Sequence, residues 1–252
     1  MAPDAPPLQT ARREPRPPGP ARLSSLSIFF PCHNEEGNVE RVVGRALEVA
    51  STLADDFEVI VVDDGSRDRT GEIADRLASE NHRVRVVHHP RNRGYGGAVQ
   101  SGFAEARKDY VFFSDGDGQF DLGELPLLVE LIQGGECDLA IGYRIHRADP
   151  FIRSLNAKLY KTLIRILFGL EVRDIDCAFK LIRRPVIEKV ALESEGALVS
   201  AEFLIKARKA GFRICEVGVH HYPRQAGQQT GAKLGVILRT FREIGRLWRQ
   251  LR

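Results

Sequence analysis

One stretch decides the fold: Phe112-Phe113-Ser114-Asp115-Gly116-Asp117-Gly118-Gln119. The apolar run at 110–113 predicts a buried strand, and a D-x-D-x-Q pattern follows its end. Strand alternation would send Asp115 and Asp117 to the same side, and the glycines allow a tight turn beside a ligand. Carboxylates at a strand end suit Mg²⁺ or Mn²⁺, which keep water and phosphate as further ligands. The pattern predicts a metal–diphosphate site; the alternative is a polar loop whose aspartates cap a turn.

Length and composition allow one large α/β domain or two small ones. The chain has 252 residues, 43% of them hydrophobic, and a formal net charge of +3, which gives no global signature of nucleic-acid binding. Its four cysteines are scattered, which favours free thiols in a reducing compartment. No apolar run approaches the ~18–20 residues of a membrane span, and we expect no secretory signal. Residues 1–22 are rich in proline and arginine and predict a disordered tail.

Short apolar runs alternate with amphipathic stretches from residue 23 onward. This alternation indicates a mostly parallel sheet covered by helices on both faces, an α/β/α sandwich of three layers. The expected strands are 26–30, 57–62, 84–87, 110–113, 138–142 and 213–219, and the expected helices are 39–53, 70–77, 98–106, 125–132, 153–168, 201–210 and 234–252. Ligands of such sheets bind beyond the carboxyl ends of the strands.

Five successive strands run into polar or glycine-rich loops. They lie at 31–36, 62–70, 92–98, 115–119 and 142–144. Each loop alone has a purely structural interpretation, since Ser66 or Asp68 could cap the helix that follows. Because all five would meet at one edge of the sheet, their coincidence favours a binding site there.

The same loops carry a family resemblance. The chain resembles the family-2 inverting glycosyltransferases with a GT-A (Rossmann-like) fold, and among them the dolichyl- or polyprenyl-phosphate mannosyltransferases. The matching motifs are P-x-x-N-E at 31–35, V-D-D-G-S-x-D-x-T at 62–70, N-x-G-x-G-x-A at 92–98, D-x-D-x-Q at 115–119 and G-Y-R at 142–144. The resemblance implies a GT-A domain at 23–222, followed at 223–252 by an acceptor-side loop and a basic amphipathic helix.

The resemblance implies roles for the matched residues. Nucleotide binding would fall to Pro31, His33, Glu35, Asp63, Asp64, Ser66, Arg93, Gly94 and Asp115. Asp63 or Asp64 would meet the base. Asp115, Asp117 and Gln119 would hold a divalent cation, Mg²⁺ or Mn²⁺. Arg144 would clamp the diphosphate, because a cation and an arginine both neutralise charge on a departing nucleoside diphosphate.

Three segments depart from the family pattern. His33 replaces the usual aromatic of the first motif. The family's D-x-T-S-G-F-R segment appears as Asp174-Ile175-Asp176-Cys177-Ala178-Phe179-Lys180, and its R-x-x-G-x-S-K loop as Arg224-Gln225-Ala226-Gly227-Gln228-Gln229-Thr230. The last two segments would face the acceptor, so the acceptor is the least constrained inference.

The acceptor side has several candidate residues. Arg153, Asn156 and Arg224 are candidates for acceptor binding, although Arg153 could equally be a surface arginine. A hydroxyl acceptor would need a general base, for which the candidates are Asp174, Asp176 and Glu202; the first two join Asp117 and Arg144 in the predicted catalytic set. His221 is a further candidate for the metal shell, although most loop histidines are not ligands.

The stretch 234–252 predicts an amphipathic helix. Its apolar positions are Leu234, Ile237, Phe241, Ile244, Trp248 and Leu251, and its basic stripe is Arg239, Arg242, Arg246 and Arg249. This combination is typical of a helix lying on an anionic membrane surface; the alternative is a helix that packs on the domain. We expect a cytoplasmic protein, peripheral at the inner face of the membrane.

The expected activity is metal-dependent, inverting transfer of a hexose, with mannose favoured and glucose next. The donor would be GDP-mannose or UDP-glucose, the acceptor polyprenyl or dolichyl phosphate, and no nucleic acid would bind. Two alternatives stay open: a soluble glycosyltransferase acting on a sugar or small-molecule hydroxyl, and a non-catalytic nucleotide-sugar-binding domain. A sugar nucleotidyltransferase is disfavoured, because its glycine-rich, lysine-bearing loop is missing after the first strand.

Overall fold

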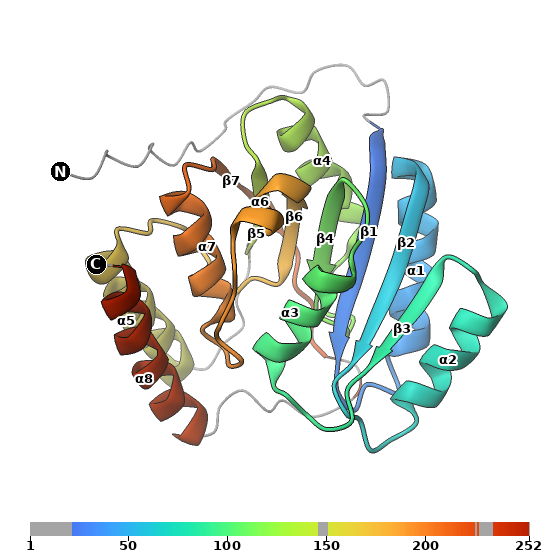
Figure 1. The fold of residues 1–252 in the computed structure, drawn as a ribbon, viewed down its shortest axis with the longest axis horizontal. Coiled ribbons are helices and arrows are strands. Elements are labelled where there is room, and N and C mark those ends of the chain that lie inside the picture. The colour runs from blue at the N-terminus through green and yellow to red at the C-terminus, as the bar shows by residue number, and fades with distance from the viewer. Residues whose placement is uncertain (1–21, 146–150, 225, 227–233, 252) are drawn as a thin grey trace.

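A seven-stranded sheet forms the centre of the computed structural model, which describes residues 22–145, 151–224, 226 and 234–251 (Figure 1). Residues 1–21 of the tail predicted at 1–22 lie outside the described residues. The strand order is β3-β2-β1-β4-β6-β5-β7. The strands are β1 (Leu23–Cys32), β2 (Ala54–Asp63), β3 (Val84–His88), β4 (Tyr110–Ser114), β5 (Leu139–Arg144), β6 (Phe179–Arg183) and β7 (Ile214–Val219). All ladders are parallel except the two that β6 forms with β4 and β5. The predicted fold class, a mostly parallel sheet flanked by helices, is confirmed.

Helices flank the sheet and connect its strands. They are α1 (Val39–Leu53), α2 (Thr70–Glu80), α3 (Tyr95–Glu105), α4 (Leu125–Gln133), α5 (Phe151–Phe168), α6 (Arg184–Lys189), α7 (Val199–Lys209) and α8 (Leu234–Leu251), with a 3₁₀ turn η1 (Leu122–Glu124) before α4. Helices α3 and α7 contact each other in front of the sheet in Figure 1, and α1 contacts η1 on the other face. The apolar periodicity of α1 predicted its bounds, because its buried positions recur at helical spacing.

Aromatic side chains of neighbouring strands separate onto the two faces of the sheet. Phe113 stacks on Phe29 at 5.3 Å between ring centroids and meets the edge of Phe103 from α3. Phe112 instead contacts Phe179 of β6 at 4.7 Å. Successive residues of a strand point to opposite faces, so the pair Phe112–Phe113 builds core on both sides. This packing holds the end of β4, and hence the loop that follows it, in place.

The strand β6 was missed by the sequence analysis. Its five residues, Phe-Lys-Leu-Ile-Arg, have charged side chains at two positions, and the first two belong to the segment 174–180, to which we assigned no secondary structure. Because β6 runs against its neighbours, Ser114 at the carboxyl end of β4 pairs with Phe179 at the amino end of β6. The segment that precedes β6 therefore arrives at the same edge as the loops that leave the parallel strands.

The helix predicted at the C-terminus is present as α8. Ile244 and Leu247 are each 3% exposed and join the hydrophobic core, whereas Arg242, Arg246 and Arg249 are exposed. This half of α8 thus packs on the domain with its arginines outward, as the alternative interpretation expected. Contact with a membrane stays a prediction. The four cysteines are free, as predicted from their spacing, and the structure shows in addition that all four are buried.

Candidate nucleotide and metal site

The polar loops meet at the carboxyl edge of the parallel strands, as their order predicted. Asp64 N donates to Cys32 O at 2.8 Å, and His89 N donates to Asp63 O at 2.9 Å, so the loops after β1, β2 and β3 are joined by backbone bonds. The loop after β4 lies against the end of β1: a Cβ on Gly116 would stand 2.3 Å from the Cys32 sulfur. Glycine is required there because the two segments approach so closely.

The D-x-D-x-Q loop is a turn rather than an extension of the strand. β4 ends at Ser114, and Gly118 has a φ of +69°, so strand alternation does not set the direction of the aspartates. That part of our reasoning was wrong, although the two carboxylates are close. Gln119 N donates to Asp117 Oδ1 at 3.0 Å, and the Gln119 amide donates to Tyr222 O at 2.7 Å. The turn is thus tied internally and to the segment after β7.

Asp115 lies beside a tyrosine that we did not single out. The Tyr95 hydroxyl, at the start of α3, donates a hydrogen bond to Asp115. Burial, and after it the negative charge of Asp117, together raise the pKa of Asp115 to about 7, although the hydrogen bond from Tyr95 acts in the opposite direction. Tyr95 occupies a variable position of the N-x-G-x-G-x-A motif. Its place between two glycines in the loop after β3 is the feature of the sequence that could have marked it as a site residue.

An arginine bridges two of the predicted site carboxylates. Arg224 Nη1 lies 3.0 Å from Glu35 Oε1, and Arg224 Nη2 lies 2.8 Å from Asp117 Oδ2. Asn38 also donates to Glu35, at 2.7 Å. Burial raises the pKa of Glu35, and the contacts with Asn38 and Arg224 oppose this shift. We expected Arg224 on the acceptor side. It instead contacts Glu35, a predicted nucleotide-binding residue, and Asp117, a predicted metal ligand.

Asp64 organises the loop after β3. Its Oδ1 accepts from Arg93 N at 2.8 Å, its Oδ2 accepts from Gly94 N at 3.0 Å, and His89 Nδ1 lies 2.6 Å from Oδ1. His33 Nδ1 lies 2.9 Å from the Asp64 carbonyl. Both carboxylate oxygens are thus engaged by protein groups, so Asp64 shapes the predicted nucleotide pocket through the backbone that it holds.

Asp63 forms a second cluster beside it. Ser66 N donates to Asp63 Oδ1 at 3.0 Å, and His88 Nδ1 lies 3.0 Å from Oδ2. Burial alone would raise the pKa of Asp63, but the bonds from Ser66 and His88 lower it. Ser66 Oγ in turn accepts from Asn34 N at 3.0 Å, which links the loops after β1 and β2.

Arg144 is paired within the protein. Its Nε and Nη2 lie 2.6 Å and 2.9 Å from the two oxygens of Asp174, a bidentate geometry. Burial disfavours the charged guanidinium, but Asp174 raises the pKa of Arg144 on balance. The pair joins the end of β5 to the segment before β6. It therefore places Arg144, which we expect to bind the diphosphate, next to the segment 174–180, which we expect to face the acceptor.

The three base candidates differ in accessibility. Glu202 is 1% exposed and accepts from the backbone N–H groups of Glu193 and Ser194 at 3.0 and 2.8 Å, so it holds a loop. Asp174 is buried against Arg144. Only Asp176 has an exposed side chain among these three.

Other predicted acceptor residues lie partly outside the described structure. The side chains of Arg153 and Asn156, in the first turns of α5, are not described, nor are residues 225 and 227–233. His221 is half-buried and contacts Phe120 at 4.8 Å between ring centroids, one residue beyond Gln119.

The donor set fits a hard divalent cation. Asp117 and Gln119 are each 7% exposed, and the negative charge of Asp117 acts on the neighbouring Asp115. The described residues contain no cluster of three His, Cys, Asp or Glu side chains able to enclose a metal. Mg²⁺ and Mn²⁺ need no such cage, because water and substrate phosphates complete their coordination.

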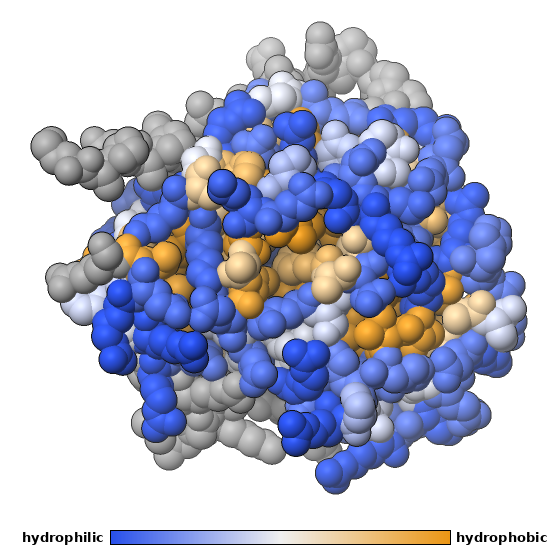
Figure 2. Space-filling view, viewed as in Figure 1, coloured by the Kyte–Doolittle hydropathy of each residue, from blue (hydrophilic) through white to orange (hydrophobic). Residues whose placement is uncertain are grey.

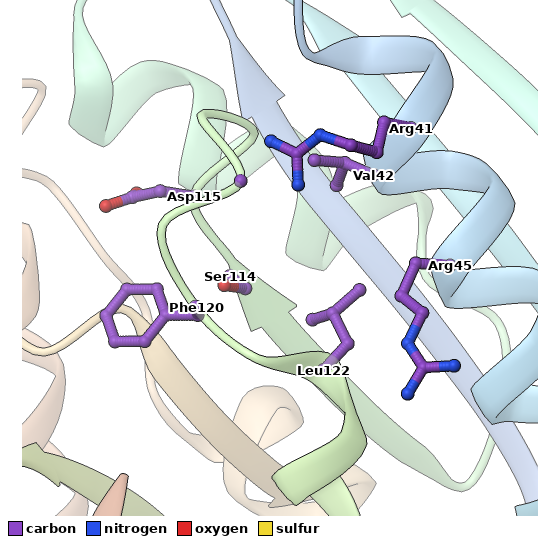
Figure 3. Close-up of a pocket in the computed structure, with 8 residues that line it drawn as sticks. Arg41, Val42, Arg45, Ser114, Asp115, Phe120 and Leu122 are labelled. Atoms are coloured by element: carbon purple, nitrogen blue, oxygen red, sulfur yellow. The ribbon is translucent and has the colours of Figure 1, made fainter. Parts of the chain in front are cut away.

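A small cavity lies behind the turn (Figure 3). Its volume of about 30 Å³ suffices for a water molecule but not a nucleotide. In Figure 3, Arg41 and Arg45 reach toward it from α1, and the Asp115 carboxylate points away from both arginines. Ser114 Oγ, at its wall, has no hydrogen-bond partner within the described chain. The cavity lies between α1 and the turn, and it is too small to be the donor pocket.

Comparisons with known proteins agree with this geometry. Residues 27–191 match the model of glycosyl transferase family 2. The chain is 36% identical to glycosyltransferase AglD of Haloferax volcanii, covering 90% of this chain but 37% of that protein. It is 32% identical to polyprenol monophosphomannose synthase of Mycolicibacterium smegmatis, covering 79% of this chain and 78% of that enzyme.

Among solved structures, glucosyl-3-phosphoglycerate synthase of Mycobacterium tuberculosis with Mn²⁺, UDP-glucose and glycerol 3-phosphate has a TM-score of 0.63. At 22% identity over 96% of this chain and 84% of that one, this likeness concerns the fold. The family match covers most of the sheet and every loop assigned above except the segment after β7. The chain therefore belongs to glycosyl transferase family 2.

Proposed function

We propose that this glycosyltransferase moves a hexose from a nucleoside diphosphate sugar to polyprenyl phosphate with inversion at the anomeric carbon. The observation that carries the proposal is the acidic cluster at the sheet edge, where Glu35 and Asp117 flank Arg224 and Asp115 lies alongside. Relatives named for polyprenyl or dolichyl phosphates support the acceptor. They include both a mannose and a glucose transferase, so the preference for mannose over glucose rests on the resemblance of the motifs alone.

The chain's own residues supply binding and charge. Glu35 and the loops held by Asp63 and Asp64 orient the nucleotide. A bound Mg²⁺ or Mn²⁺, held by Asp115, Asp117 and Gln119, would supply positive charge to the diphosphate. Arg144 and Arg224 add positive charge on the same side.

The transfer itself needs little proton chemistry. A phosphate oxygen of the acceptor attacks the anomeric carbon from the face opposite the diphosphate, and a new carbon–oxygen bond forms. The bond to the nucleoside diphosphate breaks, and its electron pair leaves with that group. A phosphate monoester is already largely ionised at neutral pH, so no strong general base is required.

A hydroxyl acceptor is the second candidate, because Asp176 has an exposed carboxylate beside the Arg144–Asp174 pair. That carboxylate would take the hydroxyl proton as the new bond forms. The product would then be a water-soluble glycoside. A non-catalytic sugar-nucleotide-binding domain is the remaining alternative.

The membrane surface is proposed as the place where the acceptor is met. Arg242, Arg246 and Arg249 are exposed on α8, and Figure 2 shows strongly hydrophilic residues along this part of the surface. Basic residues near an anionic leaflet attract a protein without insertion. Among the described helices, none is both long and apolar enough to cross a bilayer.

An acceptor screen tests the proposal. The protein is incubated with Mn²⁺, labelled GDP-mannose or UDP-glucose, and either polyprenyl phosphate or a panel of hydroxyl acceptors. Label that moves into the organic phase only with polyprenyl phosphate is the expected result. Water-soluble glycoside would support the hydroxyl alternative, and tight donor binding without turnover on any acceptor would support the non-catalytic one.

A further inference from the structure

A lysine lies buried in the middle of the sheet, beneath the site. Lys180 is 0% exposed and pairs with Phe113 of β4 on one side and Ile141 of β5 on the other. Taking an ammonium group out of water is costly unless specific contacts compensate for it. An apolar side chain of similar length would fill the same space, so the retained charge needs an explanation.

The ammonium group of Lys180 reaches back to the segment that precedes its own strand. Its Nζ donates to the carbonyl of Ile175 at 3.4 Å and to the carbonyl of Cys177. It also lies 5.3 Å from the centroid of the Phe113 ring, within range of a cation–π contact. Lys180 therefore ties the segment 174–177 to the floor of the site.

Three carboxylates act electrostatically on Lys180. Burial lowers the pKa of Lys180, whereas the negative charges of Asp176, Asp174 and Asp115 favour its charged form. Within the described residues no carboxylate forms an ion pair with it. The ammonium is thus a counter-charge shared between the predicted metal ligand Asp115 and the two acceptor-side aspartates.

From this geometry we infer that Lys180 is a positioning residue of the transfer reaction, an inference that rests on the proposed function. It acts through the segment 174–177, whose carbonyls it holds. That segment carries Asp174, which fixes Arg144, and the exposed Asp176. Loss of the tether would shift the acceptor half of the site while leaving the nucleotide loops of β1 to β3 in place.

A purely structural lysine would behave differently. Its removal would lower stability and affect every functional step in proportion to the folded fraction. If Lys180 instead holds only the segment 174–177, its removal should lower the turnover rate and leave donor binding nearly unchanged. Misplacing a reacting group by about 1 Å costs on the order of 10²-fold in rate.

The test compares Lys180→Met, Lys180→Arg and the control Lys161→Met. Lys161 Nζ donates to the Arg173 carbonyl at 3.2 Å, so it bonds the same connection from the exposed side. For Lys180→Met we expect a folded protein, binding of Mn²⁺ and nucleoside diphosphate within about threefold of wild type, and kcat on polyprenyl phosphate lower by about 100-fold. Lys180→Arg keeps the donors and should recover part of the loss, and Lys161→Met should change kcat less than about twofold.

Backbone hydrogen exchange at 174–178 provides a readout independent of any acceptor. Exchange there should rise in Lys180→Met and stay near wild type in Lys161→Met. Unchanged exchange, or an unchanged kcat in folded Lys180→Met, would overturn the inference. So would equal loss of nucleotide binding and turnover in both Lys180 variants. A wild-type protein without transfer to polyprenyl phosphate would refute the proposed function instead, and the exchange measurement would still decide whether Lys180 holds the segment.

Discussion

Arg224 Nη2 lies 2.8 Å from Asp117 Oδ2, although the two residues are 107 positions apart in the chain. The same guanidinium contacts Glu35, so one arginine balances a carboxylate expected to bind the nucleotide and another expected to bind the metal. A divalent cation bound at Asp117, as we propose, would therefore compete with this guanidinium, because both are attracted by the same negative charge.

Arg224→Gln should therefore strengthen Mn²⁺ binding in the absence of nucleotide, by roughly threefold to tenfold, since a competing positive charge is removed. Electron paramagnetic resonance of free Mn²⁺ measures this affinity. Arg41→Gln is the matched control, because Arg41 lies near the same turn but contacts Asn38 at 3.5 Å rather than a carboxylate. Weaker Mn²⁺ binding in Arg224→Gln would show that the arginine supports the cation rather than competing with it.

Asp117→Ala should abolish metal-dependent transfer, with a loss of at least about 100-fold, while the fold is retained. Within the turn the side chain accepts one bond, from Gln119 N, and outside the turn it pairs with Arg224, which keeps its contact with Glu35 in the variant. Transfer rate and far-ultraviolet circular dichroism are measured on the same preparation. Full activity in a folded Asp117→Ala protein would remove this residue from the metal site.

Gly102→Ala should destabilise the protein by about 1–3 kcal/mol, because the added methyl group would overpack the core. Its Cβ would stand 2.2 Å from the Phe29 ring. Gly44→Ala is the control on another helix: nothing lies within 4 Å of its Cβ, so the substitution should stabilise by about 0.5–1 kcal/mol. Urea denaturation measures both free energies of unfolding, and a shift of the same sign in both variants would contradict the packing argument.

The contribution of His88 to stability should decline as pH rises. Its contact with Asp75 raises the pKa of His88; burial opposes the shift, and Asp63 adds to it. A raised folded-state pKa gives stability that is fully present below the unfolded value, about 6.5, and is lost as pH rises through the folded value. The free energy of unfolding of wild type minus that of His88→Gln should thus be largest near pH 5.5 and smallest near pH 8.5. Its size should not exceed about 1 kcal/mol, because the ring is well exposed. A difference that grows with pH would refute this assignment.

Arg242→Gln with Arg249→Gln should weaken binding to anionic vesicles by roughly fivefold per residue, since each basic side chain near the surface contributes about 1 kcal/mol. Both side chains are exposed, so thermal stability should be unchanged. Cosedimentation with anionic vesicles gives the affinity, and neutral vesicles serve as the reference. Equal binding of wild type to both vesicle types would exclude an electrostatic docking surface.

The sequence predicted the elements whose pattern is local. The helix α1 buries one face, which gives its amphipathic period, and the strands β2 and β4 are buried on both faces, which gives their apolar runs. The position of the loops at one edge of the sheet follows from the order of the strands along the chain. β6 was not predicted because a five-residue strand with Lys180 at its second position and Arg183 at its end does not have the composition of a buried strand. The turn after Ser114 was not predicted, because the spacing of residues does not show at which residue a strand ends.

The contacts between site residues were less predictable than the residues themselves. Arg144 and Asp174 were both singled out, but their pairing depends on β6 lying beside β5. The pairing of Arg224 with Asp117 depends on the path of the chain after β7. Spacing between distant charges carries no information on which of them meet, so these contacts required the fold.

The Arg144–Asp174 pair closes an excursion of the chain. The chain leaves the edge of the sheet at Arg144 and reaches it again at Asp174, with α5 between the two residues, and the ion pair joins these two points. An insertion or replacement inside this detour would leave its anchor points where they are. Descendants of one ancestral enzyme could then exchange the recipient of the sugar by remodelling the detour, without disturbing the machinery that holds the activated donor.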